Sequence, residues 1–180
     1  MGVDKALLRW DAEPQVRRVA RLLELDAPPA YVYVRPARVS SASFAGLRLL
    51  HDQDPGVGPL EGLLSAFREA SNCAWLAVAV DMPFLSERAL RFLIDNRDPA
   101  AFATAYRNPE IDRPEPVCAI YEPRILPVLQ KAKAETRYSL MLLRDVPTHL
   151  LEPERPEELQ NINDPNEYRR LRRLSSPPAP

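Results

Sequence analysis

The feature that most constrains the fold is a run of apolar residues, WLAVAV at 75–80, which ends directly before Asp81. A short apolar run of this kind is typical of a parallel β-strand buried on both faces. Helical patterns lie on either side of it, at 59–70 and at 86–96, and Ser86 is the predicted N-cap of the second helix. Strands that alternate with helices predict an α/β fold with a mostly parallel sheet covered on both faces.

The rest of the chain continues this alternation. Val16, Val19 and Leu22 are spaced as on one face of a helix over 14–25. Further strands are predicted at 31–35, 47–51, 101–106, 117–121 and 147–151, and further helices at 124–133, at 138–144 and from Asp164. We therefore expect a single domain over 1–174 and a disordered tail over 175–180.

Composition excludes several classes of protein. A formal net charge of -1 argues against general nucleic-acid binding, which usually needs a basic surplus. The start, MGVDKALLRW, lacks the apolar segment of a signal peptide, and no apolar run is long enough to span a bilayer. Cys73 and Cys118 both lie in apolar stretches, which predicts two buried, reduced thiols. These features predict a cytoplasmic protein that binds neither membrane nor nucleic acid.

Glycines are scarce, and three of them cluster in one predicted loop. The chain has 20 prolines and 5 glycines, of which Gly56, Gly58 and Gly62 lie close together. Their segment joins a predicted strand to a predicted helix, where glycine lets the backbone approach a ligand and the helix N-terminus offers N–H groups. No Gly-Lys-Ser/Thr follows, so this is not a Walker A loop. Taken alone, an ordinary strand-to-helix turn would look the same.

Three further positions could carry chemistry. Asp81 ends a buried strand, where ligands bind in open α/β sheets, and one carboxylate can hold a Mg²⁺ ion that also binds nucleotide phosphates; it could instead cap the next turn. Lys5 could neutralise phosphate charge or could simply be solvated. Asn161 and Asn163, separated by one residue, would point the same way from an extended segment, towards a ligand or into the loop itself.

The order of these motifs carries more information than any one of them. The chain reads MGxDKALL at 1–8, GPLxGL at 58–63, DMPFL at 81–85 and NINDP at 161–165. This order closely resembles the molybdenum cofactor guanylyltransferase family, as far as about Leu171. The resemblance implies a three-layer, Rossmann-like nucleotidyltransferase fold. It also implies an activity, the Mg²⁺-dependent transfer of GMP from GTP to the terminal phosphate of Mo-molybdopterin with release of pyrophosphate.

The same resemblance implies roles for individual residues. Lys5 and Asp81 would be catalytic, and Asp81 would also bind Mg²⁺. The nucleotide-binding residues would be Lys5, Asp52, Gly58, Gly62 and Asp81. Asn161 and Asn163 would lie on the side of the pterin substrate. Molybdoenzymes or their chaperones would be the partners that receive the product.

Two parts of the family pattern are not matched. The family has an apolar strand and a Gly-Gly loop before the position of Met1, and it often has an asparagine where this chain reads RPAR at 35–38. We therefore expect the first strand to be absent. Either the start is placed at an internal methionine codon, or the chain is a non-catalytic binding homologue. Because Lys5, Asp52 and Asp81 are kept, the sequence favours the first. A relative that uses CTP or a sugar phosphate is the other alternative.

Overall fold

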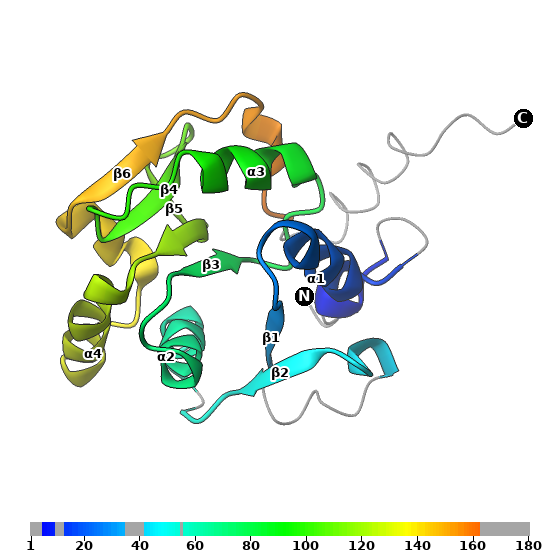
Figure 1. Ribbon diagram of the computed structural model, residues 1–180, viewed down its shortest axis with the longest axis horizontal. Coiled ribbons are helices and arrows are strands. Elements are labelled where there is room, and N and C mark those ends of the chain that lie inside the picture. The colour runs from blue at the N-terminus through cyan, green and yellow to red at the C-terminus, as the bar shows by residue number, and fades with distance from the viewer. Residues whose placement is uncertain (1–4, 10–12, 35–41, 55, 163–180) are drawn as a thin grey trace, which may run out of the picture.

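The computed structural model describes residues 5–9, 13–34, 42–54 and 56–162, and its helices and strands alternate along the chain (Figure 1). The α-helices are α1 (Gln15–Asp26), α2 (Pro59–Glu69), α3 (Glu87–Asp95) and α4 (Leu126–Ala134). The strands are β1 (Tyr31–Val34), β2 (Arg48–His51), β3 (Trp75–Val78), β4 (Ala103–Asn108), β5 (Arg113–Tyr121) and β6 (Thr148–Leu151). Short 3-10 helices span Lys5–Leu7, Ala42–Phe44, Pro123–Ile125, Leu140–Asp145 and Pro156–Leu159. The helix predicted from Asp164 and the tail predicted over 175–180 lie outside the described residues.

Six strands form two sheets. The larger has the order β3-β5-β4-β6, in which β4 pairs parallel with β6, and β5 pairs antiparallel with both β3 and β4. Strands β3, β4 and β6 therefore share one direction and β5 opposes them. Strands β1 and β2 form a separate parallel pair. The prediction of an α/β fold with mostly parallel strands is confirmed.

Helices cover both faces of the larger sheet. Side chains alternate along a strand, so neighbours in β5 face opposite layers. Ala119 and Tyr121 pack with residues of α2 and α4. Cys118 and Ile120 pack with residues of α3. The result is three layers, with α2 and α4 below the sheet and α3 above it in Figure 1, as the resemblance implied.

One prediction about β3 is wrong. Its apolar run was expected to be a parallel strand buried on both faces, yet every residue from 75 to 80 is only partly buried. The reason is its position, since β3 lies at the edge of the larger sheet and pairs only with the antiparallel β5 among the described residues. On the other side, the ring of Trp75 meets that of Tyr31 in β1 edge to face, with centroids 5.6 Å apart.

The prediction of two buried thiols is correct for Cys118 and wrong for Cys73. Cys118 is buried within β5, but Cys73 is exposed. Cys73 lies in the turn between α2 and β3, where its thiol donates a weak hydrogen bond to the carbonyl oxygen of Ala70, 3.7 Å away. Loops run over the surface of a domain, so an apolar neighbourhood in sequence does not bury a turn residue.

Candidate functional site

Asp81 and Lys5, which lie far apart in the sequence, meet at the end of β3. The Nζ atom of Lys5 donates to Oδ2 of Asp81 at 2.7 Å, across 76 residues of chain. The side chains of Lys5 and Asp81 are 30% and 20% exposed, so this ion pair is partly shielded from water while a ligand can still reach it. The structure thus brings together the two residues for which the sequence predicts a catalytic role.

An open pocket lies beside this ion pair. Four parts of the chain surround it: the first 3-10 helix, the start of α1, the residues that follow β3, and Ile162. The lining residues are Lys5, Leu8, Gln15, Val80, Asp81, Pro83 and Ile162. A second depression lies beside α3, where an ion pair joins Arg88 to Glu154, and it contains none of the predicted site residues. The chemistry therefore points to the pocket at Asp81.

The segment that contains Asn161 is attached directly to the Asp81 loop. The amide of Ile162 donates to the carbonyl oxygen of Asp81 at 3.0 Å. The side-chain oxygen Oδ1 of Asn161 is buried and has no hydrogen-bond partner in the described part of the chain. A buried acceptor of this kind is costly unless a water or ligand donates to it. A role of Asn161 in substrate binding stays a prediction, and Asn163 lies outside the described residues.

Gln15 is a pocket residue that sequence reasoning missed. It is 4% exposed, and its Nε2 donates to the carbonyl oxygen of Met82 at 3.2 Å. Its Oε1 has no partner in the described segments. The signal was present, because Gln15 occupies the same helical face as Val19 and Leu22, where an apolar residue would be expected.

Asp52 and the glycines form a second part of the candidate site, after β2. The amide of Asp52 donates to Val34 O at 3.0 Å, which places Asp52 at the ends of both strands of the smaller sheet. Asp52 is 6% exposed, and its Oδ1 accepts the amide of Asp54 at 3.1 Å. Gly58, with φ 74° and ψ -142°, directly precedes Pro59 at the first turn of α2. This conformation is essentially restricted to glycine and turns the chain into the helix.

Gly62 has a different structural role from Gly58. A Cβ atom at Gly62 would lie 3.3 Å from the ring of Tyr33 in β1. Glycine at this position therefore lets α2 approach the smaller sheet closely. A role of Gly62 in nucleotide binding stays a prediction.

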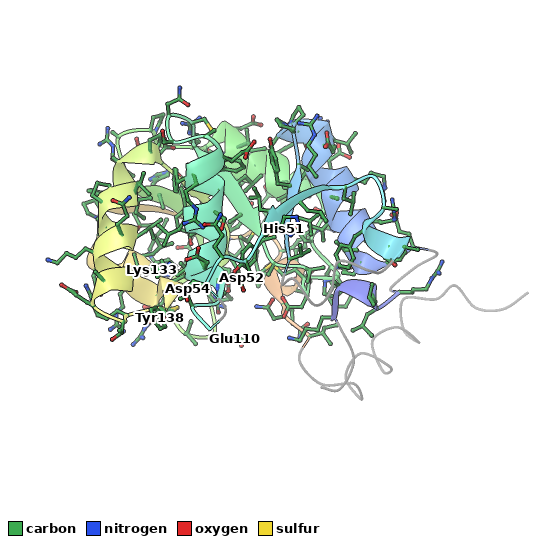
Figure 2. The ribbon with its side chains drawn as sticks, turned by 90° about the horizontal axis from the view of Figure 1, so that it is seen from below. His51, Asp52, Asp54, Glu110, Lys133 and Tyr138 are labelled. Carbon is green, nitrogen blue, oxygen red and sulfur yellow. The ribbon has the colours of Figure 1, made fainter. Side chains whose placement is uncertain are left out.

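A buried carboxylate anchors the start of α2. Glu61 is fully buried, and its Oε1 accepts from Arg68 while its Oε2 accepts from Nζ of Lys133 at 2.7 Å. Lys133 Nζ also lies 3.0 Å from Oδ2 of Asp54 (Figure 2). Hydrogen bonds to Glu61 and then Asp54 raise the pKa of Lys133 above its usual value. Sequence reasoning missed this cluster, although a glutamate within the otherwise apolar face of α2 was a visible sign of it.

The described residues do not contain a group of three or more His, Cys, Asp or Glu side chains that could hold a metal. A Mg²⁺ ion that takes most of its ligands from phosphates and water needs only one or two carboxylates. The partly exposed carboxylate of Asp81 fits that mode of binding. Among the described helices, none has the length and apolar character required to cross a membrane.

Comparison with known proteins identifies the family. Residues 1–150 match the family model of the MobA-like NTP transferase domain. A molybdenum cofactor biosynthesis bifunctional protein of Synechocystis is 27% identical over 93% of this chain and 49% of its own length. A probable molybdenum cofactor guanylyltransferase of Carboxydothermus hydrogenoformans is 28% identical over 98% of this chain and 90% of its own length. The chain thus spans about half of the first relative and nearly all of the second.

A solved structure supports the fold independently. Molybdopterin-guanine dinucleotide biosynthesis protein A from Archaeoglobus fulgidus superposes with a TM-score of 0.75 at 19% identity, over 96% of this chain and 91% of that one. The match confirms the Rossmann-like arrangement that the resemblance implied. With the family model covering most of the sequence, the chain belongs to the MobA-like NTP transferase family and is by that membership a nucleotidyltransferase.

Proposed function

We propose that this protein transfers GMP from GTP to the terminal phosphate of Mo-molybdopterin, with release of pyrophosphate. The observation that carries the proposal is the 2.7 Å ion pair of Lys5 and Asp81 beside an open pocket at the end of β3. Relatives named as guanylyltransferases of the molybdenum cofactor support GTP as the nucleotide.

The reaction is an in-line displacement at the α-phosphorus. An oxygen of the molybdopterin phosphate forms the new P–O bond while the bond from the α-phosphorus to the pyrophosphate breaks. The nucleophile already carries negative charge, so no general base has to remove a proton. Catalysis then depends on positioning and on neutralising charge.

Lys5 and Asp81 supply these two requirements in the proposal. The Lys5 ammonium is a mobile point charge, which can leave Asp81 and donate to phosphate oxygens when GTP enters. Asp81 would then hold Mg²⁺. Bound there, Mg²⁺ would supply neutralisation of the phosphate charge. Asp52, Gly58 and Gly62 lie on the nucleotide side.

The acceptor substrate lies on the side of Asn161 in this proposal. The buried Oδ1 of Asn161 lacks a partner in the described chain, and the pterin ring system offers N–H donors to it. Asn163 is proposed to act beside it. The proposal also places the protein in the cytoplasm, with molybdoenzymes or their chaperones receiving the product.

Binding of GTP tests the proposal. Calorimetry with wild-type protein should show GTP binding that requires Mg²⁺, and Asp81→Asn should largely abolish it. Asp95→Asn is the matched control, because Asp95 is an exposed carboxylate in the last turn of α3, and this variant should bind GTP like wild type. Equal GTP affinity in Asp81→Asn and wild type would contradict the proposed role of Asp81.

Competition between nucleotides tests which nucleobase the protein prefers. GTP should displace a bound fluorescent GTP analogue at far lower concentration than CTP does. A preference for CTP would indicate that the protein transfers a cytidylyl group rather than a guanylyl group. GTP binding without any pyrophosphate release in the presence of Mo-molybdopterin would instead indicate a non-catalytic binding protein.

A further inference from the structure

We infer that Lys133 is a positioning residue, which fixes Asp54 and the first turn of α2, on either side of the glycines at 56 and 58, in the arrangement that receives the nucleotide. The inference rests on the proposed function for the identity of the ligand. Lys133 lies at the end of α4, outside every motif that the sequence analysis singled out. It is therefore a new participant in the site.

One ammonium group holds both ends of the glycine loop. Nζ of Lys133 lies 3.0 Å from Oδ2 of Asp54, before the loop, and 2.7 Å from Oε2 of Glu61, after it. Figure 2 shows Lys133 reaching from α4 towards Asp54 and the Asp52 end of the loop. Further hydrogen bonds continue from both contacts, since the amide of Asp54 donates to Oδ1 of Asp52 at 3.1 Å, and the amide of Glu61 donates to the carbonyl of Gly58 at 3.0 Å. A shift of Lys133 would therefore release the loop at both ends.

The loop needs such a constraint. Gly56 and Gly58 have φ values of 118° and 74°, and glycines lose more conformational freedom on ordering than other residues do. A loop that is already ordered binds its ligand without that entropic cost. This ordering is what Lys133 contributes to nucleotide affinity.

The two contacts of Lys133 differ in kind. Glu61 is fully buried and also bonded to Arg68, so its pairing serves the stability of the fold. The side chain of Asp54 is 51% exposed, and such pairs contribute little to stability. The contact with Asp54 therefore separates a positioning role from a purely structural one.

Hydrogen exchange of the ligand-free protein tests the constraint directly. In Lys133→Met, the amides of Asp54 and Glu61 should exchange about tenfold faster than in wild type, because local opening becomes easier. Lys133→Arg keeps the charge and should restore part of the protection. Lys131→Met is the control, since Lys131 is a largely exposed residue of the same helix, and it should exchange like wild type.

Nucleotide affinity tests the consequence of that constraint. Lys133→Met and Asp54→Ala should each raise the Kd for GTP with Mg²⁺ about fivefold to tenfold, while the free energy of unfolding of Asp54→Ala stays near that of wild type. The double variant should be no worse than Lys133→Met alone, because Lys133→Met already removes the contact that Asp54→Ala removes. Asp54→Ala also removes a negative charge near a polyanion. If charge alone mattered, it would tighten GTP binding.

The outcomes separate the two claims. Tighter or unchanged GTP binding in Asp54→Ala, or unchanged amide exchange in Lys133→Met, overturns the positioning role. If the wild-type protein binds no GTP, the proposed function fails. Hydrogen exchange then still decides whether Lys133 holds the loop.

Discussion

At the scale of single residues, the chemistry of this protein is concentrated in side chains that the fold brings together from distant segments. Lys5 and Asp81 form one ion pair at the edge of a pocket, and Lys133 joins Asp54 to Glu61 beside the glycine loop. Each ammonium is paired with at least one carboxylate. Under the proposed function, the Lys5–Asp81 pair would rearrange when a nucleotide enters.

Removal of the Lys5 charge should affect turnover more than folding. Lys5→Met should lower kcat/KM for GMP transfer by about 100-fold, the usual cost of losing one group that stabilises transition-state charge. Lys5 is partly exposed, so the midpoint of thermal unfolding should change little. Steady-state measurement of pyrophosphate release checks this prediction, with Lys131→Met as a control. A variant as active as wild type would exclude Lys5 from the reaction.

The two cysteines should react very differently with thiol reagents. Burial raises the pKa of the Cys118 thiol to about 12, with a smaller contribution from Glu115, whereas Cys73 is exposed. The native protein should therefore react rapidly with one equivalent of Ellman's reagent, and with a second only after denaturation. Cys73→Ser should remove the fast reaction. Two equally fast thiols would contradict the burial of Cys118.

Sequence could predict the residues of the site better than their partners. Asp81, Lys5 and Asn161 were predicted from the order of motifs, and the structure pairs Lys5 with Asp81, while Ile162, the neighbour of Asn161, is hydrogen-bonded to Asp81. Gln15 and Lys133 could not be found in that way, because they belong to none of these motifs and are identified only by their contacts with Met82 and Glu61. Such contacts depend on tertiary packing, which local patterns do not encode.

At the scale of elements, the site depends on how helices begin. Ser86 starts α3 as predicted, and its Oγ accepts the amide of Ala89 at 3.1 Å. Gly58 and Pro59 start α2 by a different device, an unusual glycine conformation followed by a proline at the first turn. Sequence patterns predicted both helix starts because capping chemistry is local.

Substitution of the glycine before α2 should disturb that start. Gly58→Ala should lower the free energy of unfolding by about 1 to 3 kcal/mol, because alanine is strained at φ 74° and ψ -142°. No steric clash is involved, since a Cβ at Gly58 meets no atom within 4 Å. Urea unfolding measures the change. Stability equal to that of wild type would show that the loop can adopt another conformation at no cost.

Loss of the α3 cap should be milder. Ser86→Ala should cost about 1 kcal/mol in urea unfolding, because the amide of Ala89 loses its acceptor. Ser86→Asp, which restores an acceptor, should recover most of this loss. Equal stability of all three proteins would show that the Ser86 hydroxyl does not stabilise α3.

At the scale of the whole molecule, three layers position the two halves of the site at the ends of strands. The alternation of helical and strand patterns could predict a mostly parallel sheet covered on both faces, and the family resemblance implied the three layers. The alternation could not predict that β3 would lie at a sheet edge or that β1 and β2 would pair separately. Pairing partners depend on contacts between distant segments, and the period of a strand does not reveal them.

The most direct test of the account is formation of product by the purified protein with GTP, Mg²⁺ and Mo-molybdopterin. Mass spectrometry should detect the guanine dinucleotide form of the cofactor together with one equivalent of pyrophosphate, and Asp81→Asn should form neither. Absence of the guanine dinucleotide with wild-type protein, or formation of a cytosine dinucleotide when CTP is offered in its place, would contradict the proposed guanylyl transfer.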